Sequence, residues 1–161
     1  MKKIIPAALL MLALISMPGC MMKRELTVGK DIKPSDITEF YYTIDASTFP
    51  PHYQRYRFYI ENGKYYFYHE TREGSRWPLT EDDATVKGTV ELTESGWSNF
   101  LDYINAGTVT ARKDSAESGD SGPWLFIYWK NDRSKYQVFE FESYEKQKTF
   151  EIFCEDLRND Q

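Results

Sequence analysis

The sequence predicts an α+β fold, in which an antiparallel β-sheet of about five to seven strands, built on two hairpins, carries two helices on one face. Two observations predict the sheet: an Asn62-Gly63 turn lies between two alternating segments, and a second pair of apolar segments follows near the C-terminus. A third observation predicts the helices, because two stretches place apolar residues three and four positions apart.

The first hairpin joins residues 55–61 to residues 64–72. Asn-Gly suits the two positive-φ positions of a type I′ turn, and a two-residue loop fixes the register, with Glu61 opposite Lys64 and Arg55 opposite Glu70. The alternation then divides the side chains between two faces. The apolar face carries Tyr56, Phe58, Ile60, Tyr65, Phe67 and His69, and the other includes Arg55, Arg57, Tyr59, Tyr66 and Tyr68.

Other strands and the first helix surround this hairpin. Residues 40–45 form a plausible strand before it, and residues 86–92 alternate as a half-buried strand after it. Thr93 is placed to cap the next helix, which we expect to end at Gly107 in a left-handed conformation. A brief strand at 108–112 follows. The buried stripe of this helix consists of Trp97, Phe100, Leu101 and Ile104.

The C-terminal part of the chain predicts a second hairpin and a second helix. A Ser/Asp/Gly-rich segment, 113–122, indicates a loop, and apolar residues then fill 123–130 and 135–142 on either side of a short polar turn. Ser143 is placed to cap the last helix. The buried stripe of that helix consists of Phe150, Phe153, Cys154 and Leu157.

The N-terminus has the pattern of an export signal. Lys2 and Lys3 precede an apolar stretch, 4–17, and a short exit segment ends at Cys20. The apolar stretch has about 14 residues, fewer than the roughly 20 that a membrane-spanning helix needs. We therefore expect the segment to be removed rather than to remain as a transmembrane helix.

These residues resemble the lipobox of the bacterial lipoprotein class, which is cut by a type II signal peptidase. Gly19 and Cys20 match the pattern, whereas Pro18 stands where the class usually has Ala, Ser, Thr or Val. The resemblance implies that residues 1–19 are a signal peptide and that Cys20 receives a diacylglyceryl group. Residues 20–38 are then expected to form a lipidated N-terminus and flexible tether, and residues 39–161 a single α+β domain.

The resemblance also predicts the location, which is attachment to a cell membrane by the lipid on Cys20. Met21 follows the cysteine in place of the Asp that commonly retains lipoproteins at the inner membrane, so the outer membrane is expected if the host has two. Cleavage by an ordinary signal peptidase, giving a secreted or periplasmic protein, remains the alternative.

Charge and cysteine content exclude some classes of function. Once Lys2 and Lys3 are removed from the 20 basic residues, the 25 acidic residues exceed the remaining 18 by seven, which argues against a nucleic-acid partner. Only Cys20 and Cys154 are present, so a lipidated Cys20 leaves Cys154 without an intramolecular partner. Cys154 is then interpreted as a buried small hydrophobe, with a reactive thiol or an intermolecular bridge as alternatives.

No residues form a recognisable active site. The segment 119–123 is similar to the nucleophile segment of trypsin-like serine proteases but lacks one glycine, and neither His52 nor His69 is placed to complete a triad. No ligand spacing indicates a metal, and no cofactor is expected. His69 is interpreted as a core histidine bonded to a neighbour, and residues 81–83 as an exposed acidic turn or helix start.

The aromatic content leaves two function hypotheses open. The chain contains 12 Tyr, 10 Phe and 4 Trp residues, more than one helix-covered face can hide. The first hypothesis is a noncatalytic binding module that contacts another envelope protein or a glycan; the alternative is an envelope hydrolase acting on cell wall or carbohydrate through unidentified carboxylates. The candidate binding surface is Arg55, Arg57, Tyr59, Tyr66 and Tyr68. Cross-strand tyrosines that merely stabilise the hairpin would explain these residues equally simply.

Overall fold

The computed structural model describes residues 26–112, 122–130 and 138–159. In chain order the elements are η3 (Pro34–Asp36), β1 (Ile37–Ala46), β2 (His52–Glu61), β3 (Lys64–Glu73), η4 (Glu81–Asp83), β4 (Ala84–Leu92), α1 (Glu94–Ala106), β5 (Thr110–Ala111), β6 (Trp124–Trp129), β7 (Val138–Glu140) and α2 (Tyr144–Asn159), where η denotes a 3₁₀ helix. This order follows the predicted sequence of strands and helices.

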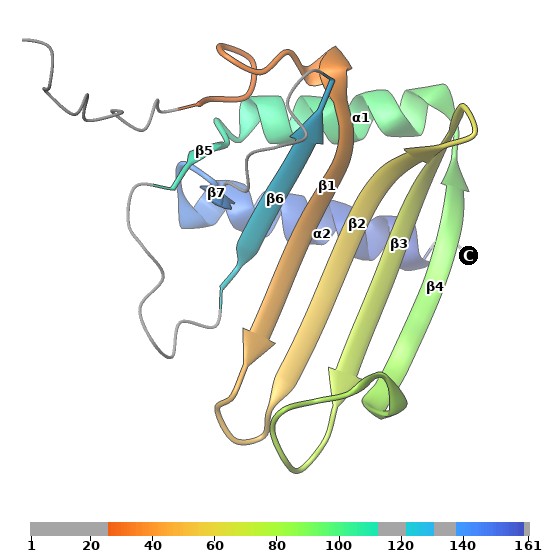
Figure 1. Ribbon diagram of the computed structural model, residues 1–161, viewed down its shortest axis with the longest axis vertical. Coiled ribbons are helices and arrows are strands. Elements are labelled where there is room, and N and C mark those ends of the chain that lie inside the picture. Colours follow the sequence, from red (N-terminus) through yellow and green to blue (C-terminus); the bar gives the residue numbers. More distant parts are fainter. Residues whose placement is uncertain (1–25, 113–121, 131–137, 160–161) are drawn as a thin grey trace, which may run out of the picture.

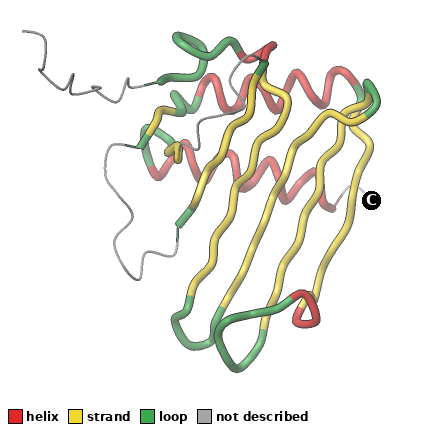
Figure 2. The backbone as a smooth tube through the Cα atoms, in the orientation of Figure 1, coloured by secondary structure: helices red, strands yellow, loops and turns green. Residues whose placement is uncertain are grey.

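Seven strands form one antiparallel sheet in the order β4-β3-β2-β1-β6-β7-β5. Helices α1 and α2 both cross the same face of this sheet, as the ribbon shows (Figure 1). The backbone trace separates the two layers clearly, with the strands in front of the helices (Figure 2). The predicted α+β class, with helices on one face of an antiparallel sheet, is confirmed.

The first hairpin has the predicted register. Glu61 lies opposite Lys64, and the pairing continues without a shift to Arg55 opposite Glu70. Asn62 has a φ of 51° and the next residue, Gly63, a φ of 76°, which are the two left-handed conformations that a type I′ turn requires.

The second hairpin joins the sheet through β6. Leu125 lies opposite Phe139 in β7 and opposite Tyr42 in β1. The described part of the C-terminal strand ends at Glu140, two residues before the predicted end at 142, and residues 135–137 of the prediction lie outside the described residues. The turn of this hairpin and residues 113–121 of the predicted loop 113–122 lie outside the described residues.

The core is an aromatic cluster between the sheet and both helices. The Phe58 ring of β2 stacks on Phe100 of α1, with a centroid distance of 4.0 Å and an interplanar angle of 5°. Phe150 of α2 meets Phe40 of β1 edge-on at 5.4 Å. All four side chains are fully buried. Because both helices meet the same strands, they can bury only one of the two faces of the sheet.

Both predicted helix caps are present, but the left-handed residue is not the predicted one. Thr93 Oγ1 accepts a hydrogen bond from the backbone N–H of Gly96 at 3.1 Å. Ser143 Oγ likewise accepts one from the backbone of the last helix. Gly107 has an ordinary φ of −73°, whereas Thr108 has a φ of 49°. The glycine serves close packing instead, because a Cβ atom there would lie 2.8 Å from the ring of Phe141.

The domain begins earlier in the chain than predicted. Residues 26–38 were expected to belong to a flexible tether, yet Val28 and Ile32 are 3% and 1% exposed and belong to the core. The backbone N–H of Val28 donates to Val109 O at 2.9 Å, and Thr27 bridges to Thr110 of β5. Apolar side chains in this polar segment therefore pack against the domain, and the expectation is corrected for residues 26–38.

The predicted signal peptide, residues 1–19, and Cys20 lie outside the described residues. Within the part of the chain that is described, neither α1 nor α2 is long and apolar enough to cross a membrane.

Candidate functional site

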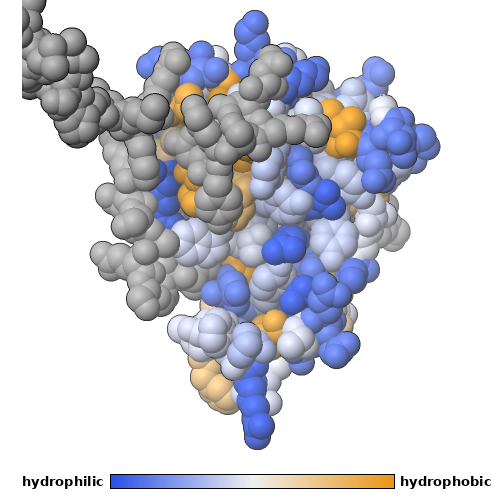
Figure 3. Space-filling model, in the orientation of Figure 1, coloured by the Kyte–Doolittle hydropathy of each residue, from blue (hydrophilic) through white to orange (hydrophobic). Residues whose placement is uncertain are grey.

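The second face of the sheet carries no helix among the described residues. We call it the open face and define it by side chains of β1, β2, β3 and β6 that project away from the core. Its residues are Glu39, Tyr41, Tyr53, Arg55, Arg57, Tyr59, Tyr66, Tyr68, Glu70, Arg72 and Tyr128. Figure 3 views this side and shows strongly hydrophilic residues interleaved with residues of intermediate hydropathy. Tyrosine and charged side chains thus alternate across it.

The structure brings all five residues of the predicted surface onto the open face, each half-buried. Tyr59 and Tyr66 are cross-strand partners whose rings stack with a centroid distance of 5.2 Å. Arg57 lies opposite Tyr68 in the same ladder. Their shared face follows from the period of two in a strand, but a role in binding is not shown by their position.

Sequence reasoning missed the neighbours that β1 and β6 supply. The guanidinium of Arg57 lies 4.2 Å from the Tyr59 ring and forms an ion pair with Glu39 of β1, with an Nη2–Oε1 distance of 2.5 Å. Tyr41 donates its hydroxyl hydrogen to the same carboxylate at 2.6 Å. Burial and this hydrogen bond raise the pKa of Tyr41 to about 12. The sequence predicted only a strand at 40–45, and the pairing of β1 with β2 and β6 was needed to place Tyr41 here.

A second arginine–carboxylate–tyrosine group lies on β3. Glu70 is 3% exposed, and its carboxylate accepts hydrogen bonds from Arg72 Nε at 2.6 Å and from the Tyr68 hydroxyl at 2.9 Å. Burial by itself raises the pKa of Glu70, but these hydrogen bonds outweigh burial and hold the pKa below its usual value. Burial and the bond to Glu70 raise the pKa of Tyr68 to about 12. The charges of this group are therefore satisfied internally.

Arg55 lies between these two groups and is held differently. Its guanidinium carbon is 5.3 Å from the Tyr53 ring and 5.9 Å from the Tyr41 ring, and its Nε donates to Thr43 Oγ1 at 3.4 Å. Although Arg55 lies opposite Glu70 in the ladder, no described carboxylate forms an ion pair with it. Arginine can bind a carboxylate through two parallel N–H donors, so Arg55 is a candidate for anion recognition.

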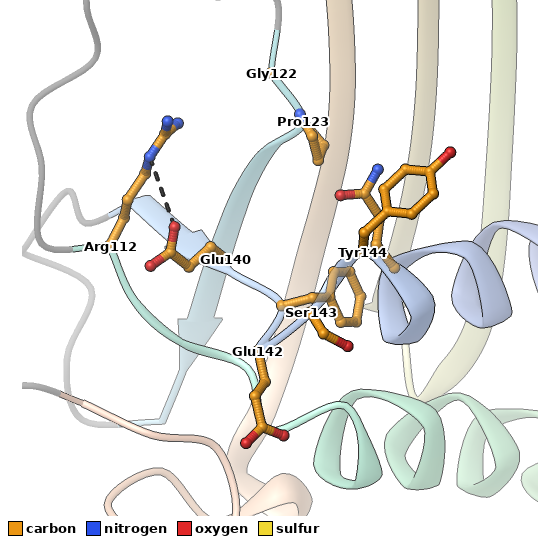
Figure 4. Close-up of a pocket in the computed structure, with 9 residues that line it drawn as sticks. Arg112, Gly122, Pro123, Glu140, Glu142, Ser143 and Tyr144 are labelled. Atoms are coloured by element: carbon orange, nitrogen blue, oxygen red, sulfur yellow. Dashed lines mark ion pairs between the residues drawn. The ribbon is translucent and has the colours of Figure 1, made fainter.

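A pocket of about 280 Å³ lies away from these residues, where β6 begins and α2 starts. Glu140 lines it and forms an ion pair with Arg112 at 3.8 Å. Glu142 also lines the pocket, but its carboxylate points away from that pair (Figure 4). Because the two acids do not converge, this pocket gives no support to the hydrolase hypothesis, which needs carboxylates on either side of a scissile bond.

The other candidate residues have structural explanations. His69 is 5% exposed in the core, as expected, but neither ring nitrogen has a hydrogen-bond partner among the described residues, which corrects the predicted bond. The acidic turn 81–83 is a 3₁₀ helix whose Asp83 and Thr80 form a reciprocal cap. Among the described residues, no group of three or more His, Cys, Asp or Glu side chains could hold a metal ion.

Comparisons with protein-family models, with curated proteins and with solved structures find no match to this chain.

Proposed function

We propose that this protein is a noncatalytic binding module of the bacterial cell envelope, whose open face binds another envelope protein that presents an acidic side chain to Arg55. The observation that carries the proposal is the position of Arg55, half-buried between tyrosine rings and without an ion-pair partner among the described residues. An incoming carboxylate would meet a guanidinium that is already positioned by its neighbours.

The residue types of the open face suit a protein interface. Tyrosine and arginine are enriched where proteins bind, because they bring a large contact area and retain polar groups. The hydroxyls of Tyr41 and Tyr68 are held by Glu39 and Glu70, so these rings have less conformational freedom to lose on binding.

The shape of the open face favours a protein over a small molecule. Sites for small molecules are usually concave, whereas stable protein interfaces cover a broad surface. The open face spans four adjacent strands, and the pocket described above includes none of its defining residues. A glycan is the alternative occupant that the experiment below must distinguish.

We further propose that Cys20 carries the lipid that attaches the mature chain to a membrane, and that this is the outer membrane if the host has two. The support is the lipobox-like sequence that ends at Cys20. Mass spectrometry of the mature N-terminus should find an acylated Cys20, and Cys20→Ala should move the protein to the soluble fraction. A mature N-terminus that is cleaved after the signal peptide but carries no acyl group would favour the secreted or periplasmic alternative.

The binding proposal is tested by photo-crosslinking in the host, followed by affinity measurement. A photoreactive residue replaces Tyr66 on the open face or, as a control, Tyr144, which is 70% exposed on α2. We expect a discrete adduct only from the open face. An adduct that proteases degrade indicates that the partner is a protein, whereas an adduct that glycosidases remove would indicate that the partner is a glycan.

The identified partner is then purified and its Kd measured. Arg55→Gln and the double variant Tyr66→Ala with Tyr68→Ala should each weaken binding by roughly tenfold or more, because central Tyr and Arg residues dominate interface energies. Tyr144→Ala should leave the Kd unchanged. Equal crosslinking from both positions, or an unchanged Kd in folded open-face variants, would contradict the proposal.

A further inference from the structure

β4 is a long edge strand, almost as long as the three ten-residue strands beside it. It stands at one end of the strand order and runs for nine residues, from Ala84 to Leu92. At the opposite end, β5 has two residues and is bridged by Thr27. No described segment pairs with the outer side of β4, so a row of backbone hydrogen-bonding groups is left without partners from the sheet.

The register shows which residues carry these outward groups. In a two-residue hairpin the residues that flank the turn, here Glu61 and Lys64, form a hydrogen-bonded pair, and such pairs recur at every second position. The odd-numbered residues of β3 therefore bond to β4, where Phe67 lies opposite Val90. The backbone groups of β4 that point outward belong to the odd-numbered residues Lys87, Thr89 and Glu91, whereas a register shift interrupts the alternation at Thr85.

The side chains of β4 are complementary to a second copy of the same strand. In an antiparallel pair whose two-fold axis passes through Thr89, Lys87 of each copy lies opposite Glu91 of the other. Two pairs of opposite charge therefore form across the axis. An axis through Lys87 or Glu91 would instead place like charges opposite each other, which is unfavourable. With the axis at Thr89, the outward backbone N–H and C=O groups of one copy also face those of the other. Ladder hydrogen bonds can therefore form between the two strands.

The face of β4 on the side of the helices is complementary in the same register. Val86 is 40% exposed there, and the axis at Thr89 places it opposite Leu92 of the second copy. This contact would cover an apolar side chain that the single chain leaves in solvent. Glu91 already meets Lys64 within its own chain at 2.9 Å, but both side chains are more than half exposed and leave room for a second cation.

We propose that two copies of this chain associate through their β4 edges, antiparallel and centred on Thr89, to join their sheets into one. The two-fold axis is perpendicular to the sheet, so the two open faces lie on the same side and the helices of both copies on the other. The inference stands independently of the function proposed for the open face, because it rests only on β4.

Disulfide trapping tests the register directly in the full chain. Thr89→Cys should crosslink to its own copy, because directly opposite residues have Cα atoms about 5.5 Å apart, within disulfide range. Thr85→Cys is the matched control, since Thr85 is an exposed residue of the same type on the same edge. It lies at the register shift of β4 and would be roughly 27 Å from its own copy. The unsubstituted chain gives the background from Cys20 and Cys154.

We expect mild oxidation to trap the Thr89→Cys dimer roughly tenfold faster or more than the Thr85→Cys dimer, because pairing raises the local thiol concentration. Thr89→Pro removes an outward N–H and should make the chain monomeric in analytical ultracentrifugation at an unchanged melting temperature. Two results would overturn the proposal. One is equal trapping of the two cysteine variants, and the other is an unsubstituted chain that stays monomeric at about 100 μM, a concentration at which weak dimers form. If Thr89→Pro does not fold, the two cysteine variants decide.

Discussion

The hydroxyl of Tyr42 donates a hydrogen bond to the carboxylate of Glu151, across the interface between β1 and α2. Glu151 also accepts hydrogen bonds from Gln147 at 3.0 Å and from Lys148 at 2.5 Å. Burial by itself raises the pKa of Glu151, but the three hydrogen bonds outweigh it and keep the pKa below its usual value. An ionised carboxylate therefore connects the second helix to the centre of the sheet.

Tyr42→Phe should lower the free energy of unfolding by about 1–3 kcal/mol, because it removes one donor from a buried charge and leaves the ring in place. Tyr41→Phe is the matched control on the half-buried open face, where water can replace the lost bond to Glu39. Its cost should be smaller. Urea unfolding measures both, and equal losses would contradict the role given to Glu151.

His69 should make the stability of the protein depend on pH. Burial lowers the pKa of His69, and the positive charge of Arg158 lowers it further, so the folded protein binds a proton less readily than the unfolded chain. The free energy of unfolding is then not reduced by His69 above its unfolded pKa of about 6.5. It falls as the pH drops from there toward the lower pKa of His69 in the folded protein. Glu70 and Glu151, whose folded pKa values are also lowered, lose their contributions below about 4.5.

His69→Leu should abolish the pH dependence between about 6.5 and 5. It should also raise the stability at neutral pH by about 1 kcal/mol, because it removes two buried nitrogens without partners. Urea unfolding at several pH values measures both effects. If the free energy of unfolding of the variant depends on pH as steeply as that of the parent protein, a group other than His69 titrates in this range.

Gly107→Ala should destabilise the protein by about 1–3 kcal/mol, because its Cβ would lie 2.8 Å from the Phe141 ring and 3.0 Å from the backbone oxygen of Tyr103, so these neighbours would have to shift. Gly96→Ala is the matched control near the start of the same helix. Its Cβ would make only ordinary contacts, at 3.5 Å or more, so it should stabilise by about 0.5–1 kcal/mol. Thermal unfolding should thus shift in opposite directions for the two variants.

Cys154 should resist thiol reagents in the folded protein. The residue is fully buried, and burial raises the pKa of its thiol, so both access and ionisation are suppressed. Ile152→Cys, on a position that is 57% exposed in the same helix, should react at the rate of a free thiol. Peptide mapping after timed alkylation distinguishes the two sites, and fast labelling of Cys154 without denaturant would revive the reactive-thiol alternative.

The fold was predictable where local chemistry and periodicity agreed. Asn62 and Gly63 specify one turn, and that turn fixes which side chains of β2 and β3 face the core. The start of the domain was not predictable. A polar segment that contains Gly29 and Pro34 is typical of a linker, whereas the burial of Val28 depends on contacts with distant residues such as Val109.

The candidate surface was predictable only within the hairpin. The period of two placed Arg57 and Tyr59 on one side, but Glu39 reaches Arg57 because β1 lies next to β2, and Tyr128 reaches Tyr41 because β6 lies next to β1. Pairing between segments almost 90 residues apart leaves no local signal in the sequence. That Arg55 has no ion-pair partner among the described residues likewise emerges only once its neighbours are placed.

The bridge between Thr27 and Thr110 joins the described N-terminal segment to β5, at the opposite margin of the sheet from β4. Any tension applied through the N-terminus would therefore load β5 and its short contacts first, while the long ladders between β1 and β4 carried little strain. Mechanical unfolding from this end should begin by peeling off residues 26–36, leaving the tyrosine-bearing strands assembled.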